Sequence, residues 1–195
     1  DIPLPTPEFE STVPGLFVAG ELGGMGLIRN ALAQGRQAVD AIQRKRRRTT
    51  PGCLDLLIVG AGPAGFSASL AAKSHGMSFA TIEQESLGGC VFQYPRGKLV
   101  MTQPAELPLI GKVRFRQTSK EELLGFWEDI ERSTGIADNM HYRERVEAIV
   151  ADGTQGFAYH LGRDASKALS AAILDALWQR EACREAVQDA LIPIA

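Results

Sequence analysis

The chain has 195 residues, 45% of them hydrophobic, which is enough for one buried core and a smaller appendage. Its 21 basic and 23 acidic residues leave a net charge of -2, which predicts no partner among nucleic acids or anionic membranes. No apolar run reaches the roughly 20 residues of a membrane helix, and no basic-then-apolar leader opens the chain. Its 3 cysteines lie far apart, so we expect neither a disulfide framework nor a metal site. This cysteine usage fits a protein of the reducing cytoplasm.

The first 43 residues predict a strand, a glycine turn and a helix. The opening is rich in proline and begins with Asp1, so we expect a piece of a larger protein. Residues 15–20 form a short apolar run between glycines, which is typical of a buried parallel strand. Apolar side chains at three- and four-residue steps then predict a helix over residues 25–43.

A basic run, Arg44 to Arg48, and Pro51-Gly52 follow, and they predict a linker over residues 44–52 because like charges repel and Pro-Gly breaks a helix. A nuclear-import signal or a nucleic-acid patch is the alternative. No aromatic side chain lies within the run, so a solvated linker is favoured.

A βαβ unit is predicted next. Residues 54–59 form a second apolar strand that enters a glycine turn, a helix runs to about Ala72, and residues 77–82 form a third strand. The prediction is an α/β fold with a Rossmann-like parallel sheet over residues 53–158, in which strand 54–59 is central. A nucleotide then lies across the carboxyl edge of the sheet.

Later segments add two helical predictions. Ser119 and Glu122 form a capping box for a helix whose apolar stripe includes Phe126 and Trp127 as core residues. Residues 142–150 predict a strand. Residues 159–195 predict a helical tail, free either to dock on the domain or to pair with another chain in a homo-oligomer.

The glycine turn has a separate steric reason at each position. Gly60 allows the tight strand-to-helix turn, Gly62 allows the backbone to approach a phosphate, and Gly65 allows helix and strand to pack closely. The helix N-terminus offers N–H groups and partial positive charge to a pyrophosphate. Glu83, at about the expected 20-residue distance, predicts a ribose-binding carboxylate, with Glu85 as the alternative. A carboxylate at this position repels the 2′-phosphate of NADP, so FAD and NAD remain the two candidate nucleotides.

Residues 55–65 and 81–83 resemble the first FAD motif of the pyridine-nucleotide-dependent flavin reductases, and the form Gly-Pro-Ala-Gly, with Pro63 and Ala64, favours FAD. Residues 87–95 and 98–102 resemble the thioredoxin-reductase-like branch, which includes bacillithiol-disulfide-reductase-like proteins. The resemblance implies that the loop with Gly88 and Gly89 approaches the flavin.

Residues 11–21 are similar to the second FAD motif of the same enzymes, which normally stands near their C-terminal end. The resemblance implies that Gly20 and Glu21 lie at the flavin, where the family usually has Asp to hold a ribityl hydroxyl. In this chain, the motif that normally ends a flavoprotein module therefore precedes the motif that normally begins one. The chain is either a junction between two modules, which is the simpler reading, or a permuted FAD domain.

Such enzymes pass hydride from NAD(P)H to FAD and then electrons to a disulfide or another acceptor. A separate NAD(P)H domain has no recognisable counterpart here, so we expect the FAD-binding portion of an oxidoreductase, incomplete on its own. The alternatives are an NAD-binding domain and a catalytically silent module that acts through association.

Few other residues suggest chemistry. Cys90 is a candidate redox thiol if a nearby charge lowers its pKa, but it has no partner cysteine, so a small packing residue is favoured. Arg96 and Lys98 are candidates for a phosphate or for the flavin's pyrimidine edge, or are solvated. The histidines, which lack any catalytic spacing, are expected to be structural or exposed: His75, His141 and His160.

Overall fold

A computed structural model describes residues 5–21, 27–45, 53–101, 103–115, 117–146, 148–149 and 155–156. The chain divides into two compact units, residues 1–144 and 145–195. In the second unit the described elements are β8 (Ala148–Ile149) and β9 (Gln155–Gly156), which pair antiparallel. The predicted tail over 159–195 lies outside the described residues.

A three-stranded parallel sheet organises the first unit. Its order is β1 (Leu56–Val59), β2 (Phe79–Glu83) and β7 (Met140–Tyr142), and α2 (Pro63–Ser74) crosses from β1 to β2. This confirms the α/β class and the βαβ unit. The prediction that the first of these strands is central was wrong for the described strands, because β2 lies in the middle and β1 at one edge.

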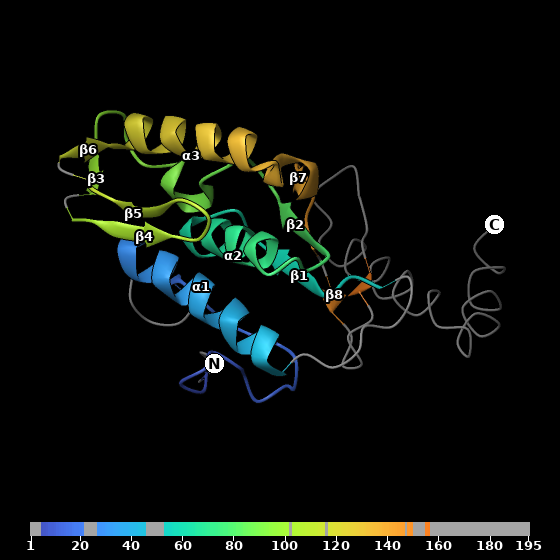
Figure 1. Cartoon of the computed structure of the whole chain (residues 1–195). Helices are drawn as coiled ribbons and strands as arrows, with labels where there is room; N and C mark the ends of the chain where they lie inside the picture. The colour runs from blue at the N-terminus through green and yellow to red at the C-terminus, as the bar shows by residue number, and fades with distance from the viewer. Residues whose placement is uncertain are drawn as a thin grey trace, which may run out of the picture. The chain divides into compact units, whose positions relative to one another are not determined.

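Helix α2 lies between the two other long helices. It packs against α1 (Ile28–Lys45) on one side and α3 (Lys120–Thr134) on the other, as Figure 1 shows. Phe66 of α2 and Trp127 of α3 are fully buried and stack at 5.1 Å between ring centroids. A helix that is covered by another helix on each of two sides needs apolar or small side chains around most of its circumference. The buried side chains of α2 are of these kinds.

Helix α1 differs slightly from its predicted span of 25–43. Leu32 and Val39 are buried on the face that the spacing predicted, whereas Leu27, just before the helix, is 59% exposed. The helix continues to Lys45, so the first two residues of the predicted linker belong to it.

Helix α3 begins at the predicted capping box. The Ser119 hydroxyl accepts a hydrogen bond from the Glu122 N–H, and the Glu122 carboxylate accepts one from the Ser119 N–H at 2.8 Å. The helix ends at Gly135, whose positive φ of 69° suits a C-terminal cap. A 3-10 helix, η3 (Ile136–Asn139), leads into β7.

Short elements fill the chain between β2 and α3. They are the 3-10 helix η2 (Gly89–Val91) and two antiparallel pairs, β3 (Leu99–Met101) with β6 (Thr118–Ser119), and β4 (Ala105–Leu107) with β5 (Gly111–Val113). β4 packs against α1.

Two predicted strands differ in the structure. Residues 15–20 form a loop in which Phe17 makes an isolated bridge to Glu10, because Gly15 and Gly20 both adopt positive φ. The single strand predicted over 142–150 is interrupted: β7 ends at Tyr142, Arg143 has a φ of 63° that breaks the extended backbone, and the described strand residues later in this range are those of β8.

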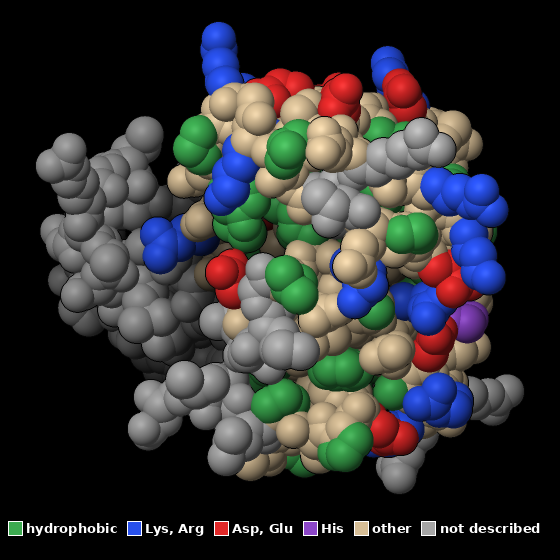
Figure 2. All heavy atoms as spheres, turned by 90° about the vertical axis from the view of Figure 1, so that its left-hand side faces the viewer, with side chains coloured by type: hydrophobic (Ala, Val, Ile, Leu, Met, Phe, Trp, Pro, Cys, Tyr) green, Lys and Arg blue, Asp and Glu red, His purple; other side chains and the backbone are tan. Residues whose placement is uncertain are grey.

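The face of the molecule drawn in Figure 2 has no large patch of side chains of one charge. Lys and Arg side chains are spread over this face, with Asp and Glu among them and hydrophobic side chains in small groups. Within the described part of the chain, no helix is both long enough and apolar enough to cross a bilayer.

Candidate functional site: a glycine-lined cleft

The turn between β1 and α2 has the geometry that its three glycines predicted. Gly60 has a φ of 98°, which a residue with a side chain rarely adopts. A Cβ on Gly65 would lie 1.8 Å from the Gly60 carbonyl oxygen, so α2 starts in direct contact with the turn. Gly65 therefore permits the close packing of helix on strand.

The N-terminus of α2 is open to a ligand. Gly62 is the N-cap and Pro63 opens the helix, and no side chain caps the first turn. A Cβ on Gly62 would meet nothing closer than the Gly88 carbonyl oxygen at 3.8 Å. The unpaired N–H groups and the positive end of the helix dipole therefore suit an anion such as a pyrophosphate.

Glu83 lies at the end of β2, beside this turn. Its side chain is buried, with a relative exposure of 6%, and its two oxygens accept hydrogen bonds from the N–H groups of Ala61 at 2.8 Å and Glu85 at 2.9 Å. These bonds fix the carboxylate at the cleft wall and leave it further acceptor capacity. The carboxylate of Glu85 instead accepts a hydrogen bond from Gln93 at 2.6 Å.

The loop with Gly88 and Gly89 lies against the glycine turn. The Gly88 N–H donates to the Ala61 carbonyl at 3.0 Å, and both glycines have positive φ. A Cβ on Gly89 would come within 3.2 Å of the Gly62 backbone. Glycine is thus required here for the loop to approach the turn.

Lys120, the first residue of α3, holds the following turn in place. Its ammonium group donates to the carbonyl oxygens of Phe92 at 3.0 Å and Tyr94 at 2.7 Å. Next to it, the Glu121 carboxylate accepts a hydrogen bond from the Gly97 N–H at 3.2 Å. The turn that carries Tyr94 is therefore fixed from the N-terminus of α3.

The N-terminal segment reaches the same place. The Gly20 N–H donates to the side-chain oxygen of Gln34 in α1 at 2.8 Å, and a Cβ on Gly20 would lie 3.0 Å from the Ala64 Cβ. Glu21 follows, and its carboxylate accepts a hydrogen bond from the Cys90 thiol at 3.7 Å. The residues of the two motif-like segments thus lie together.

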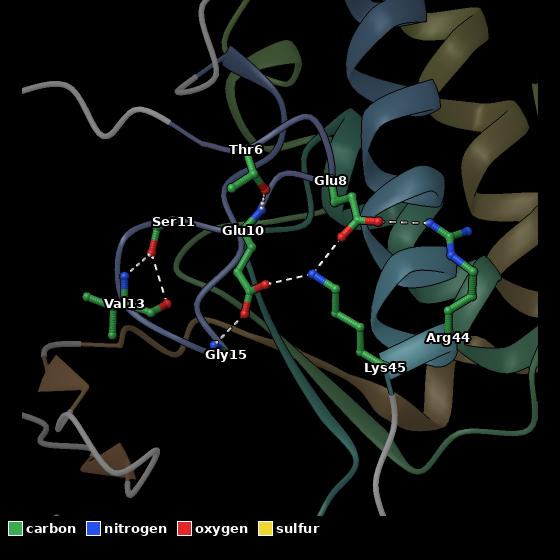
Figure 3. Close-up of polar contacts among 8 residues, drawn as sticks. All are labelled: Thr6, Glu8, Glu10, Ser11, Val13, Gly15, Arg44 and Lys45. Atoms are coloured by element: carbon green, nitrogen blue, oxygen red, sulfur yellow. Dashed lines mark hydrogen bonds and ion pairs between the residues drawn. The ribbon is translucent and has the colours of Figure 1, made fainter.

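An ionic cluster anchors the preceding loop to the end of α1 (Figure 3). The Lys45 ammonium group lies 2.5 Å from Glu8 and 2.8 Å from Glu10, and Arg44 lies 3.9 Å from Glu8. The second oxygen of Glu10 accepts a hydrogen bond from the Gly15 N–H at 3.0 Å. These contacts hold the loop that leads to Gly20.

Two cavities adjoin at the glycine turn. The larger, of about 510 Å³, has walls that include Glu83, Gln84, Glu85, Gly89 and Gln93. The smaller, of about 200 Å³, is lined by both segments of the chain, including Gly20, Glu21, Ile28, Pro63 and Ala64. Both cavities are lined by four shared residues: Gly60, Gly62, Cys90 and Tyr94. They form one cleft across the start of α2.

Cys90 is exposed at this junction rather than packed in the core. Partial burial and the nearby Glu21 carboxylate both raise the pKa of the Cys90 thiol. The neighbouring charge therefore acts against thiolate formation, which is opposite to what a reactive thiol requires.

Other candidate residues do not line the two cavities. Arg96 and Lys98 are absent from the described walls of both cavities, and the Lys98 ammonium group lies over the Tyr94 ring at 4.0 Å. His75 follows α2 and pairs with Asp40 of α1 at 2.7 Å, and His141 lies 3.8 Å from a Glu144 oxygen. His160 lies outside the described residues.

Three residues that matter to this geometry carry weaker sequence signals. Gly35 is an isolated glycine inside a helical pattern, which often marks a close approach to another element. A Cβ there would meet the Ala64 carbonyl oxygen at 2.0 Å. Gln34 and Lys120 act through single side-chain contacts with distant backbone atoms, which no local spacing predicts.

Comparison with known families gives a match within this region. Residues 55–99 match the family described as FAD binding domain. This segment includes the glycine turn, Glu83 and the Gly88-Gly89 loop, so the match supports FAD as the nucleotide and agrees with the resemblance to FAD-dependent oxidoreductases. A search of the curated proteins finds no match to this chain.

Solved structures give partial matches, each at 20% sequence identity. Bacillithiol disulfide reductase from Staphylococcus aureus aligns over 46% of this chain and 28% of its own, with a TM-score of 0.39. The same enzyme from Bacillus cereus aligns over 51% and 31%, with a TM-score of 0.44. A flavin monooxygenase from Stenotrophomonas maltophilia aligns over 56% and 34%, at 0.43. The chain thus spans about a third of these proteins.

Proposed function

We propose that this chain is the FAD-binding portion of a flavin-dependent NAD(P)H oxidoreductase, similar to the disulfide reductases of the thioredoxin-reductase-like branch. The observation that carries the proposal is the uncapped N-terminus of α2, set behind Gly60 and Gly62 with the Glu83 carboxylate beside it. These groups fit the pyrophosphate and the adenosine ribose of a dinucleotide. The match of this segment to an FAD binding domain supports FAD over NAD.

In this proposal, the two halves of FAD would occupy the two adjoining cavities. Glu83 and the α2 N-terminus would hold the ribose and the pyrophosphate, as the larger cavity's lining supports. Gly20 and Glu21, which line the smaller cavity, would hold the flavin half, where Glu21 exchanges its contact with Cys90 for a ribityl hydroxyl. Pro63 and Ala64 border that side of the turn. The loop with Gly88 and Gly89 would approach the flavin half from the larger cavity, which Gly89 lines.

Bound FAD would accept a hydride from NAD(P)H and pass two electrons to an acceptor, which the family resemblance suggests is a disulfide. This chain's own part is to bind and orient the flavin nucleotide, because the described cleft contains no evident second nucleotide site. We further propose that the protein is soluble and cytoplasmic and that it binds neither nucleic acid nor membranes. Its predicted helical tail would allow it to form homo-oligomers.

The test begins with the visible absorbance of the purified chain. Any bound nucleotide is then released by heat and identified by chromatography, and NADH or NADPH is added anaerobically. Stoichiometric FAD supports the proposal, and bleaching of the flavin band would show that the chain accepts a hydride itself. Bound NAD without FAD would assign an NAD-binding domain instead. A folded chain that binds neither nucleotide would instead support the alternative of a catalytically silent module that acts through association.

A further inference from the structure

The two motif-like segments, on either side of the basic run, belong to one compact unit, residues 1–144. Helix α1 comes from the segment before the run, and α2 comes from the segment after it. At their closest approach, Gly35 faces the Ala64 backbone, where a Cβ would lie 2.0 Å from the carbonyl oxygen and 2.8 Å from the carbonyl carbon. The two helices therefore touch backbone to backbone beside the glycine turn.

Polar contacts between the segments extend along α1 from Arg29 to Asp40. Arg29, near its start, hydrogen-bonds to Gln103. Arg36 lies 3.4 Å from the Glu106 carboxylate, and Asp40 lies 2.7 Å from the His75 ring. The helix buries one face of small and aliphatic side chains in this interface: Ala31, Leu32, Gly35, Ala38, Val39 and Ala41. An interface of this kind resembles the interior of a domain rather than a passing contact between modules.

The smaller cavity needs both segments. Gly20, Glu21 and Ile28 line it from before the basic run, and Pro63 and Tyr94 line it from after the run. The Glu21 carboxylate and the Cys90 thiol meet across it. Neither segment encloses this space alone.

We infer that this chain builds its flavin site in cis, as a permuted FAD domain in which residues 5–21 and 27–45 complete the cleft that residues 53–101 begin. The basic run then connects two parts of one domain and does not separate two modules. This inference rests on the proposed function for the identity of the ligand, but the assembly itself can be tested without any ligand.

The first experiment compares two Gly→Ala changes in helices. Alanine favours helix over glycine at both sites. Gly35→Ala places a methyl group against the Ala64 backbone, whereas Gly125→Ala, in α3, has nothing within 4 Å. We expect Gly35→Ala to weaken FAD binding about tenfold or more, with Gly125→Ala unchanged. Equal FAD affinity for both variants and the wild type would overturn the inference.

The second experiment separates cis from trans assembly. Chains with Gly35→Ala and chains with Gly62→Ala are co-expressed, each being defective in a different half of the cleft. If the halves come from one chain, every site stays defective and FAD binding is not recovered. Recovery of part of the wild-type FAD binding would show that the halves come from different chains, which contradicts cis assembly.

The third experiment needs no nucleotide. In a chain whose three cysteines are replaced by Ser, Asp40→Cys and His75→Cys are introduced and treated with a short bifunctional maleimide. A cross-link within the monomer, located by peptide mass spectrometry, supports cis assembly. A covalent dimer, or no cross-link between these positions, overturns it. This result stands even if the wild-type chain binds no FAD, which would refute only the proposed function.

Discussion

At the scale of single residues, Gly62 and Gly65 have different tasks. Gly65 is required by the fold, because any side chain there would collide with the Gly60 carbonyl oxygen. A Cβ on Gly62 would make an ordinary van der Waals contact with the Gly88 carbonyl oxygen at 3.8 Å, and the φ of -69° is ordinary, so the fold itself accepts a side chain at this position. Its glycine is instead suited to the ligand, whose phosphates approach the backbone there.

This difference predicts opposite outcomes for two matched variants. Gly62→Ala should keep the melting temperature of the wild type and weaken FAD binding about tenfold or more, because the methyl group occupies the phosphate's place. Gly65→Ala should lower the melting temperature itself. Calorimetry and FAD titration check both variants. Unchanged FAD affinity in a folded Gly62→Ala chain would contradict the assigned role of Gly62.

The contact between Glu21 and Cys90 predicts the reactivity of the thiol. Burial and the Glu21 carboxylate raise the pKa of Cys90, so the reactive thiolate is scarce near neutral pH. Glu21→Gln removes the negative charge, which should lower the pKa and speed alkylation of Cys90 by iodoacetamide at pH 8. Peptide mass spectrometry follows the reaction, with Cys53 as the internal control. An alkylation rate at Cys90 that does not change would show that Glu21 exerts no control over the thiol.

At the scale of elements, α3 positions the wall of the cleft through its first residue. Lys120→Met would remove both hydrogen bonds to the Phe92 and Tyr94 carbonyls while keeping the length of the side chain. We expect weaker FAD binding and a changed quenching of flavin fluorescence by Tyr94, and partial recovery with Lys120→Arg. Lys112→Met, at an exposed position of β5, serves as the control. Identical affinity and quenching in all variants would remove Lys120 from the positioning of the cleft.

The loop before Gly20 should respond to acid. The backbone hydrogen bond from Gly15, and then Lys45, lower the pKa of Glu10, and Lys45 lowers the pKa of Glu8. Their contribution to loop attachment is therefore complete above the ordinary carboxyl pKa and is lost as the pH falls through the lowered values.

Amide exchange measures this loss. The Ser11 N–H donates to the Leu16 carbonyl and the Val18 N–H to the Phe9 carbonyl within the loop. After correction for intrinsic rates, their protection should decline at acid pH before that of the buried sheet. In Lys45→Met this acid-dependent decline should be smaller. Protection that is independent of pH would exclude the ionic cluster as the anchor.

Elements whose signals are local were predictable from sequence. The capping box at Ser119 and the turn at Gly60 each depend on neighbours within a few residues, and both stand as predicted. The strand expected over residues 15–20 failed, because its apolar run could not reveal that two positive-φ glycines would turn it into a loop. The edge position of β1 also escaped, since strand order is decided by pairing over long distances.

At the scale of the whole molecule, the glycine turn and Glu83 could be assigned as a pair because βαβ geometry fixes their separation in space. The packing of α1 against α2 could not be derived in this way. It depends on Gly35 meeting Ala64 across a sequence distance that includes the basic run. The order of the two motifs favoured a junction between two modules, whereas α1 buries its apolar face and packs against α2.

The most direct measurement is an equilibrium titration of the nucleotide-free chain with FAD and, separately, with NAD, followed by flavin fluorescence and by calorimetry. We predict one FAD per chain, bound more tightly than NAD, because the cleft joins a ribose and pyrophosphate site to a second cavity that suits the flavin half. A chain that is folded by circular dichroism but binds no FAD, or that binds NAD more tightly, would contradict the assignment of this cleft to FAD.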